Sequence, residues 1–148
     1  MKGKCKQAIT TLLLQFVDST FPLFAATPDG LRSCLCLGQG LVEIKCCFKN
    51  RNADIADISV SSFYLDENKH LKRTLRYNTQ VQFQMYVCGK SFCDFVVYTH
   101  KGIVIETIPY NPDFVNELIS KCTQIAINDL LPEIIQRIFQ MRSKEMNS

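Results

Sequence analysis

Apolar residues recur at helical spacing most clearly in the last third of the chain. Asn111 is a suitable helix N-cap, Pro112 fits the first helical position, and Asp113 places an acid in the first turn. The apolar residues that follow are Phe114, Leu118, Cys122, Ile125 and Ala126. This pattern predicts a helix over 112–129. Pro132 then begins a second predicted helix, whose apolar positions are Ile134, Ile135, Ile138 and Phe139.

The middle of the chain predicts a helix followed by two strands. The segment LRYNTQVQFQMYVCG, residues 75–89, has the pattern of a helix that stops at Gly89. Two strand-like segments follow, FCDFVVYT and GIVIETIPY, joined by the short turn His100-Lys101-Gly102. Within them, we interpret Asp94 as structural and Glu106 as a solvent-facing strand residue.

The first half of the chain is richer in turn signals. Residues 6–17 fit either a short helix or a strand. Pro28-Asp29-Gly30 is a turn signal that ends an apolar, strand-like piece. LRSCLCL then leads through Gly38-Gln39-Gly40 into LVEIKCCF, which predicts a β-hairpin. Residues 49–62 are mixed, and a helix over 54–61 is one interpretation.

These elements predict an α/β fold with a small, mainly antiparallel mixed sheet flanked by helices. The composition agrees, because 148 residues with 47% hydrophobic and 21% charged residues are typical of one globular domain. No apolar run reaches the length of a membrane span, so we expect no membrane association. The net charge of +3 permits nucleic-acid binding without requiring it.

The cysteines do not have the spacing of a metal site. The chain has eight cysteines but no CxxC pair and only two histidines, which argues against a zinc site. Most cysteines lie in apolar runs, where a free thiol behaves as a small hydrophobic residue. We therefore expect an intracellular protein, in the nucleus or cytoplasm, where cysteines stay reduced.

Two charged residues interrupt the apolar segment GLVEIKC. In an extended chain Glu43 and Lys45 point to the same side as Leu41, while the opposite side is apolar. Charged residues are rarely buried without partners, so this face either lines a wet cleft or contains a structural ion pair. Asp29 lies fourteen positions before Glu43. Two carboxylates near a lysine can bind Mg²⁺ or Mn²⁺, and the backbone carbonyl of Ile44 is a further candidate ligand.

The candidate metal site belongs to a longer ordered set of motifs. The blocks TPDG, LVEIKC, YNTQVQFQM and CDFVVYT occur in this order. Together they resemble the YqaJ-like viral recombinase family, relatives of the lambda-type alkaline exonuclease within the PD-(D/E)xK nucleases. The resemblance implies a restriction-endonuclease-like core. It also implies a Mg²⁺- or Mn²⁺-dependent DNA nuclease of the 5′-to-3′ exonuclease type, linked to recombination or repair.

The same resemblance assigns roles to individual residues. Asp29 and Glu43 would be metal ligands, Lys45 the catalytic lysine, and Tyr77 and Gln80 the family's Y-x-x-Q pair. The spacing of three places Tyr77 and Gln80 on one helical face, with Gln84 one turn beyond Gln80. The alternative for Tyr77 and Gln80 is an ordinary amphipathic helix surface.

The sequence departs from the family pattern before Asp29. Nothing in residues 1–20 matches the family's upstream half, so we expect residues 21–141 to be the C-terminal part of a YqaJ-like nuclease domain, followed by a polar tail at 142–148. Cys47 also replaces the family's usual proline. An upstream nuclease segment or a second copy of the chain is therefore an expected partner. The alternative function is a catalytically inactive relic that binds nucleic acid or protein.

Two further expectations concern the surroundings of the site. Asp29 can share a metal with Glu43 if Asp29 lies opposite Lys45 in the hairpin, and this pairing requires a loop over about 34–40. A tight turn at 38–40 would instead separate the two carboxylates by too great a distance. The basic run before the predicted central helix offers Lys72, Arg73 and Arg76 as DNA-binding residues, or is a solvated loop.

Overall fold

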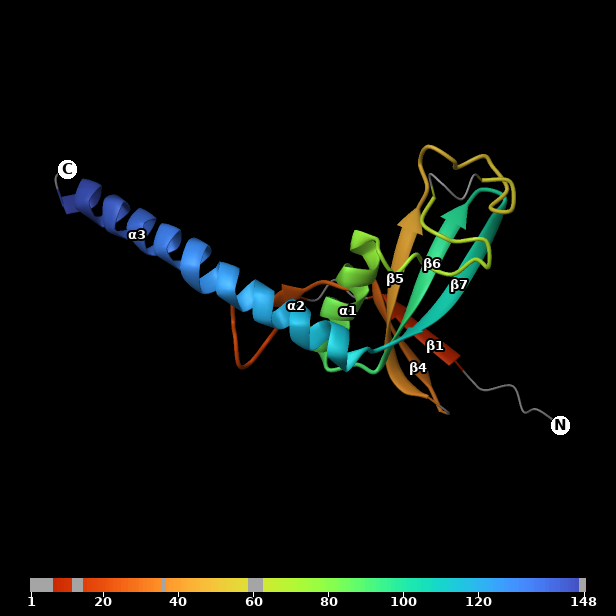
Figure 1. Cartoon of the computed structure of the whole chain (residues 1–148), viewed down its shortest axis with the longest axis horizontal. Helices are drawn as coiled ribbons and strands as arrows, with labels where there is room; N and C mark the ends of the chain where they lie inside the picture. The colour runs from red at the N-terminus through yellow and green to blue at the C-terminus, as the bar shows by residue number, and fades with distance from the viewer. Residues whose placement is uncertain (1–6, 12–14, 36, 59–62, 147–148) are drawn as a thin grey trace. The chain divides into compact units, whose positions relative to one another are not determined.

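The computed structural model describes residues 7–11, 15–35, 37–58 and 63–146 (Figure 1). The chain divides after Asn111 into two compact units, and each is described by itself. The first contains the sheets and one helix, and the second, from Pro112 onward, is helical. Residues 59–61 of the predicted helix over 54–61, residue 36 of the predicted hairpin loop and residues 12–14 lie outside the described residues.

The first unit is built around a five-stranded mixed sheet with the order β1-β4-β5-β6-β7. Its strands are β1 (Gln7–Thr11), β4 (Gly30–Cys34), β5 (Gly38–Cys46), β6 (Phe92–Thr99) and β7 (Gly102–Pro109). β5 and β6 are parallel, and the other neighbours are antiparallel. The predicted mixed, mainly antiparallel sheet is therefore confirmed. Part of segment 6–17, which fits either a short helix or a strand by sequence, forms the edge strand β1.

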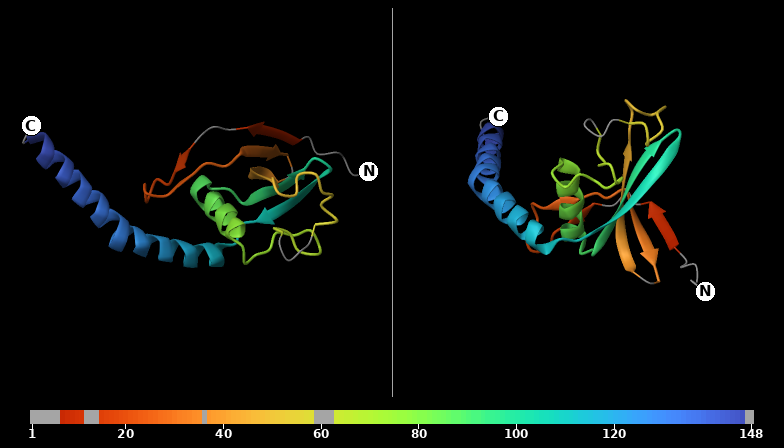
Figure 2. Two further views of the ribbon diagram at one scale, coloured as in Figure 1. Left: turned by 90° about the horizontal axis from the view of Figure 1, so that it is seen from above. Right: turned by 45° about the vertical axis from the view of Figure 1, so that its right-hand side comes forward.

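A second, two-stranded sheet pairs β2 (Phe16–Val17) with β3 (Ala25–Ala26). Both of its strands contact helix α1 (Arg76–Cys88). In both views of Figure 2, α1 lies beside the main sheet, and it also contacts β5 and β6. The helix ends as predicted: Gly89 adopts a left-handed conformation with φ 61°, and its N–H caps the carbonyl of Tyr86.

The core of this unit lies between α1, the sheet and the connection from β5 to α1. Its innermost residues are Leu41, Phe95 and Val97 from the strands, Val81 and Met85 from α1, and Leu65 and Leu71 from the connection. Residues 54–58 form turns, so the predicted helix is wrong over the part of 54–61 that the structure describes. The side chain of Asp54 accepts the N–H of Ala56 at 2.9 Å, a local bond that favours a turn over a helix.

The β4–β5 hairpin fixes the register on which the candidate site depends. Gly30 pairs with Val42 and Cys34 with Gly38, so the connection covers residues 35–37. A loop over 34–40 was predicted, with Asp29 opposite Lys45; the observed loop is shorter, and the register differs from the predicted one by two residues. Gly38, with φ 76°, provides the left-handed turn that allows this tighter connection.

The second unit is one helical run. It consists of α2 (Pro112–Ile125), a π-helical segment (Ala126–Leu130) and α3 (Leu131–Met146). The predicted helix from 112 is present, and the second predicted helix, from Pro132, is present as α3, which the π-helical segment joins to α2 without a break. Proline removes one backbone donor near the start of α3, and the wider π-helical turn before it lets the chain continue without a break. Among the described residues, no helix is both long and apolar enough to cross a membrane.

Candidate active site

Glu43 is the centre of the candidate site. It lies on the α1-facing side of β5 and is 3% exposed. Its Oε1 accepts hydrogen bonds from Gln80 Nε2 at 2.7 Å and from Lys45 Nζ, and its Oε2 accepts one from Gln84 Nε2 at 2.9 Å. Gln80 and Gln84 are one helical turn apart, so consecutive turns of α1 hold one carboxylate from both sides.

Asp29 lies immediately before β4 and beside the same part of β5. Continuing the hairpin register by one residue beyond Gly30–Val42 places Asp29 opposite Glu43. Its exposed carboxylate accepts the backbone N–H of Ile44 at 2.6 Å. Because the N–H and C=O of a strand residue point to the same edge, the Ile44 carbonyl lies on the edge that Asp29 occupies. The structure therefore brings Asp29, Glu43 and the Ile44 carbonyl to one end of the hairpin.

Lys45 connects the carboxylate to the aromatic residues at the start of α1. Its ammonium group bonds Glu43 and lies 5.0 Å from the centroid of the Tyr77 ring. The hydrogen bond from Arg76 lowers the pKa of Tyr77, and the positive charge of Lys45 contributes in the same direction. Tyr64 packs edge-on against Tyr77 at 4.9 Å, and its burial raises its pKa to about 12.

Cys93 on β6 lies opposite Leu41 on β5, near the carboxylates of this region. Burial raises the pKa of the Cys93 thiol, and the negative charges of Glu43, Asp94 and Asp29 raise it further. Lys45 pairs with Glu43 and Arg32 pairs with Asp94, so positive charges lie next to two of these three carboxylates.

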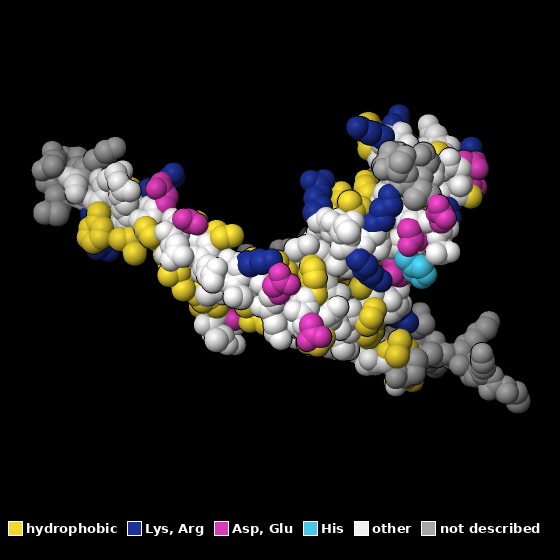
Figure 3. Space-filling view, viewed as in Figure 1, with side chains coloured by type: hydrophobic (Ala, Val, Ile, Leu, Met, Phe, Trp, Pro, Cys, Tyr) yellow, Lys and Arg dark blue, Asp and Glu magenta, His cyan; other side chains and the backbone are white. Residues whose placement is uncertain are grey.

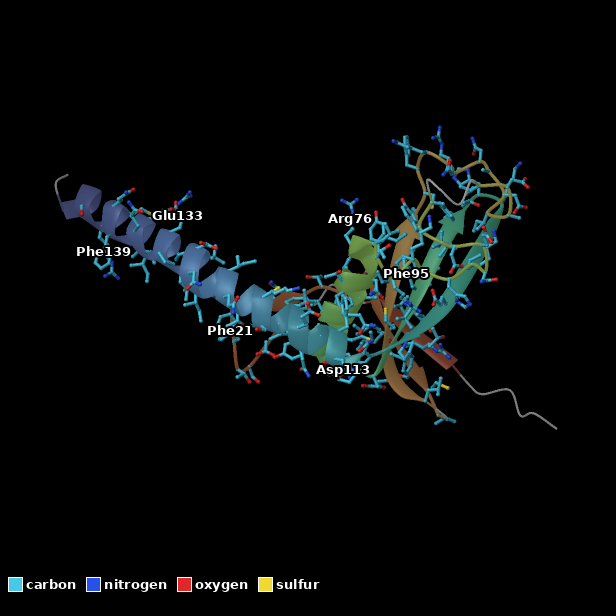
Figure 4. All side chains as sticks on the ribbon, in the orientation of Figure 1. Phe21, Arg76, Phe95, Asp113, Glu133 and Phe139 are labelled. Atoms are coloured by element: carbon cyan, nitrogen blue, oxygen red, sulfur yellow. The ribbon has the colours of Figure 1, made fainter. Side chains whose placement is uncertain are left out.

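The predicted DNA-binding residues differ in their surroundings. Arg76 is exposed at the start of α1, where Figure 4 labels it, and its guanidinium donates to the Tyr77 hydroxyl at 3.3 Å. Arg73 instead donates to Glu106 at 2.6 Å and to Asn78. Lys72 donates its backbone N–H to Tyr64 at 3.0 Å. Figure 3 shows Lys and Arg side chains over the connection between β5 and α1 and near the start of this helix.

Glu106 corrects a prediction. It was expected to face solvent, but it is 9% exposed and accepts the N–H of Leu71 at 2.5 Å as well as the guanidinium of Arg73. Glu106 therefore anchors the connection that precedes α1. Asp94, interpreted as structural, pairs with Arg32 and accepts the Thr107 hydroxyl at 2.6 Å.

Sequence reasoning missed two contributors to this region, Tyr64 and Arg32. Tyr64 belongs to a connection without regular spacing, and Arg32 finds its partner 62 positions away. Neither residue stands in a motif with a characteristic spacing, so no local signal identified them. The contacts of Gln84 follow from its helical spacing to Gln80.

The donor set fits a divalent cation that prefers oxygen. Mg²⁺ is usually held by one or two carboxylates together with substrate phosphates and waters, which corresponds to Asp29, Glu43 and the Ile44 carbonyl. The buried Oε1 of Gln84, next to Glu43, has no hydrogen-bond partner in the structure and is a further oxygen acceptor. Within the described ranges, no cluster of three or more His, Cys, Asp or Glu side chains is placed to hold a metal. A metal at this position would therefore depend on two carboxylates and on neutral oxygens.

Comparisons with known proteins connect this architecture to a nuclease fold. No protein-family model matches the chain, and no curated protein matches it by sequence. A crystal structure of an alkaline exonuclease (LHK-Exo) from Laribacter hongkongensis matches with a TM-score of 0.61 and 20% identity. The LHK-Exo structure in complex with dAMP matches with a TM-score of 0.65 and 23% identity.

The likeness extends over most of this chain and part of the exonuclease. In both comparisons it covers 93% of this chain and 64% of the other, so the chain spans about two thirds of the length of its structural relative. The chain has the fold of the alkaline exonuclease, a restriction-endonuclease-like core with a mixed five-stranded sheet. The predicted resemblance to lambda-type alkaline exonucleases is thus confirmed at the level of the fold.

Proposed function

We propose that this chain is the nuclease domain of a metal-dependent DNA exonuclease that hydrolyses phosphodiester bonds. The observation that carries the proposal is the meeting of Asp29, Glu43, Lys45 and Gln80 at one end of the β4–β5 hairpin. An ion pair with a purely structural role would not require a second carboxylate, Asp29, at the same place. The nuclease fold of the chain gives the same chemistry a precedent.

The proposed metal ligands are Asp29, Glu43 and the Ile44 carbonyl. When bound there, Mg²⁺ or Mn²⁺ would neutralise phosphate charge and make a water molecule more acidic. Gln80 and Gln84 orient Glu43 through their hydrogen bonds, so that the carboxylate keeps one direction as substrate arrives. Asp29 is already oriented by the Ile44 N–H.

Lys45 is the proposed catalytic lysine. Its ammonium lies between Glu43 and the ring of Tyr77, where it can donate a hydrogen bond to a phosphate oxygen. That contact would stabilise the negative charge that develops as the phosphodiester bond breaks. Tyr77, with a pKa below the ordinary tyrosine value, is the proposed second donor near the attacking water.

DNA is the proposed substrate. The dAMP complex of the structural relative supports this choice, as does the exposed Arg76 at the start of α1. Lys72 and Arg73 remain proposed DNA contacts, although Arg73 is already paired with Glu106. The proposal includes 5′-to-3′ polarity, a role in recombination or repair, and a reducing compartment, the nucleus or cytoplasm.

A specific observation supports the alternative of an inactive DNA-binding relic. Three of the four acceptor positions of the Glu43 carboxylate are already occupied by hydrogen-bond donors, which leaves a metal one position, on Oε2. An upstream nuclease segment or a second copy of the chain is a proposed partner that would supply further site residues.

The test is degradation of end-labelled linear duplex DNA with Mg²⁺, comparing the wild type with Lys45→Ala and with Lys121→Ala. Lys121 is an exposed lysine on α2 that pairs with Glu117, so its replacement is a matched control. Activity that is lost only in Lys45→Ala supports the proposal. A folded wild type without activity contradicts it and favours the inactive relic.

A further inference from the structure

A pocket lies at the carboxyl end of the two parallel strands β5 and β6. It opens where β5 and β6 end and has a volume of about 150 Å³. Phe48, Arg51, Tyr98 and His100 contribute its larger side chains, and Cys46 directly follows Lys45. In open α/β sheets, ligands bind in the crevice outside the carboxyl ends of parallel strands, and this pocket occupies that position.

Backbone hydrogen bonds hold the pocket in shape. The N–H of Cys47 donates to the Tyr98 carbonyl at 3.3 Å, and the N–H of His100 donates to the Arg51 carbonyl at 2.7 Å. These bonds tie the segment after β5 to the end of β6. The Arg51 guanidinium also donates to the Phe48 carbonyl at 3.0 Å, and this bond holds the Arg51 side chain over the Phe48 ring. The pocket is therefore formed before any ligand arrives.

The pocket combines exposed aromatic rings with positive charge. Phe48 is 77% exposed, and the guanidinium of Arg51 lies 4.5 Å from its ring centroid. Tyr98 is 40% exposed, and its ring lies 6.3 Å from that of His100. A large aromatic residue left in water beside an arginine is the arrangement with which proteins stack single-stranded bases and hold the adjoining phosphate.

We propose that this pocket binds one unpaired, pyrimidine-sized base of single-stranded DNA. The proposal rests on the proposed nuclease function. A cavity of about 150 Å³ in other proteins holds a benzene-sized ring, which fits a pyrimidine better than a purine. The Phe48 ring provides the stacking surface, Arg51 faces the phosphate, and His100, whose Nδ1 lies 3.0 Å from Asn52 Oδ1, borders the edge of the base.

The pocket and the candidate site share the carboxyl end of β5 but differ in the face of the sheet they use. Cys46 and its β6 partner Tyr98 line the pocket and point away from α1, whereas Lys45 points toward α1. A single strand that occupies both places therefore passes around the end of β5, and a base held at Phe48 would anchor it there. This step involves binding alone, and no bond forms or breaks in the pocket.

The test is binding of a fluorescent single-stranded oligothymidylate, measured by anisotropy in EDTA so that no hydrolysis occurs. The variants are Phe48→Ala, Phe48→Leu and Phe48→Trp, with Phe139→Ala on α3 as the matched control because Phe139 is also largely exposed, at 64%. Loss of stacking on one base costs about 1–3 kcal/mol, so Phe48→Ala should weaken binding by about tenfold. Phe48→Leu should lose as much, Phe48→Trp should retain binding, and Phe139→Ala should bind like the wild type.

A second readout does not depend on affinity. Cys46 is exposed at the pocket, so bound thymidine 5′-monophosphate should slow its alkylation, which peptide mass spectrometry resolves from that of the other cysteines. Wild-type binding in Phe48→Ala overturns the proposal, and so does wild-type binding in Phe48→Leu, which would indicate an apolar peptide site. A wild type that does not bind the single strand overturns it as well.

The proposed function and the pocket can fail separately. Single-strand binding through Phe48 without Mg²⁺-dependent cleavage would leave the pocket in place and contradict the nuclease proposal. Cleavage that depends on Lys45, together with unchanged binding in Phe48→Ala, would support the nuclease proposal and contradict the base-binding pocket.

Discussion

The side-chain amide of Gln84 lies 2.9 Å from one oxygen of Glu43, a residue 41 positions earlier in the chain. One turn earlier on α1, Gln80 contacts the other oxygen at 2.7 Å. The helix that covers the sheet therefore also fixes the direction of a carboxylate that β5 places in a nearly buried position. Burying a carboxylate is unfavourable unless donors surround it, so the two amides and Lys45 offset the cost of burying Glu43.

The first prediction concerns the stability of the Glu43–Lys45 pair. Lys45→Met leaves a buried carboxylate without its cation and should lower the free energy of unfolding by about 3 kcal/mol. The double variant Glu43→Gln/Lys45→Met removes both charges and should be closer to the wild type. Urea denaturation of the two single variants and the double variant measures the coupling.

The exposed pair Glu117–Lys121 provides the control for this cycle. Its side chains are 69% and 67% exposed, so Lys121→Met should change stability little. Equal effects of Lys45→Met and Lys121→Met would contradict the view that burial determines the cost.

The second prediction concerns metal binding by Asp29. The amide oxygen of Asp29→Asn can still accept the Ile44 N–H, so the variant should fold. It lacks one of the two negatively charged ligands and should therefore bind Mg²⁺ at least tenfold more weakly, a loss of about 1.4 kcal/mol in binding free energy. Titration of the melting temperature with MgCl₂ measures this, because a ligand that binds the native state raises it.

Asp54→Asn is the matched control for Asp29→Asn. Asp54 is also exposed and accepts a backbone N–H, that of Ala56. This variant should respond to Mg²⁺ like the wild type. If both aspartate variants respond like the wild type, Asp29 is not a metal ligand.

The third prediction separates two neighbouring arginines. Arg73 pairs with the buried Glu106, so Arg73→Ala should lower the free energy of unfolding by about 1 kcal/mol. Arg76 is exposed, so Arg76→Ala should leave stability unchanged and weaken DNA binding, with the slope of log K against log salt falling by about 1. Thermal unfolding and anisotropy titrations at several salt concentrations distinguish them. A reversed pattern would mean that Arg73 is the stronger of the two DNA contacts and that Arg76 contributes to stability.

The fourth prediction concerns the two tyrosines at the start of α1. Burial raises the pKa of Tyr64 to about 12, above the ordinary value of 10, so folding favours its neutral form. Its contribution to stability is complete below pH 10 and is lost as the pH rises from 10 to about 12. Tyr64→Phe should flatten the decline in stability over that interval. In an alkaline absorbance titration, Tyr64→Phe should remove the tyrosine that ionises at the highest pH. Tyr77→Phe should remove the tyrosine that ionises at the lowest pH, because the hydrogen bond from Arg76 lowers the pKa of Tyr77.

The sequence predicted α1 and the strands around it because their signals are local. Gly89 ends the helix in the left-handed conformation that glycine favours, and β6 and β7 follow a short turn. The ordered motif blocks also led to the alkaline exonuclease fold. Glu106 was misjudged because its partners, Leu71 and Arg73, are 35 and 33 positions away. Both faces of β7 carry isoleucine or valine, so alternation could not show which face is buried.

The hairpin register was predicted only in part for a related reason. The glycines at 38 and 40 mark a bend, but the sequence does not show which of them lies in the turn and which in the strand. In the structure, Gly38 adopts the left-handed conformation at the turn, and Gly40 lies within β5, opposite Arg32 of β4. Tertiary packing makes this choice, because the ring of Phe92 occupies the space over Gly40.

The last prediction tests this packing. A Cβ at position 40 would lie 2.1 Å from the Phe92 ring, so Gly40→Ala should force the ring aside and lower the free energy of unfolding by about 1–3 kcal/mol. Gly102→Ala is the matched control, because nothing lies within 4 Å of its Cβ. Urea denaturation should show a loss only for Gly40→Ala, and Gly40→Ala/Phe92→Ala should lose less stability than the two single changes added together.

The same substitution connects packing to the candidate site. The Phe92 ring also lies 5.6 Å beneath the Arg32 guanidinium, which pairs with Asp94 across β4, β5 and β6. Displacement of the ring would therefore disturb the alignment of β4 with β5, on which the position of Asp29 beside Glu43 depends. Gly40→Ala should weaken Mg²⁺ binding together with stability, and Phe92→Ala in the same chain should restore part of both. Reduced stability with unchanged Mg²⁺ binding would show that the carboxylates keep their positions independently of this packing.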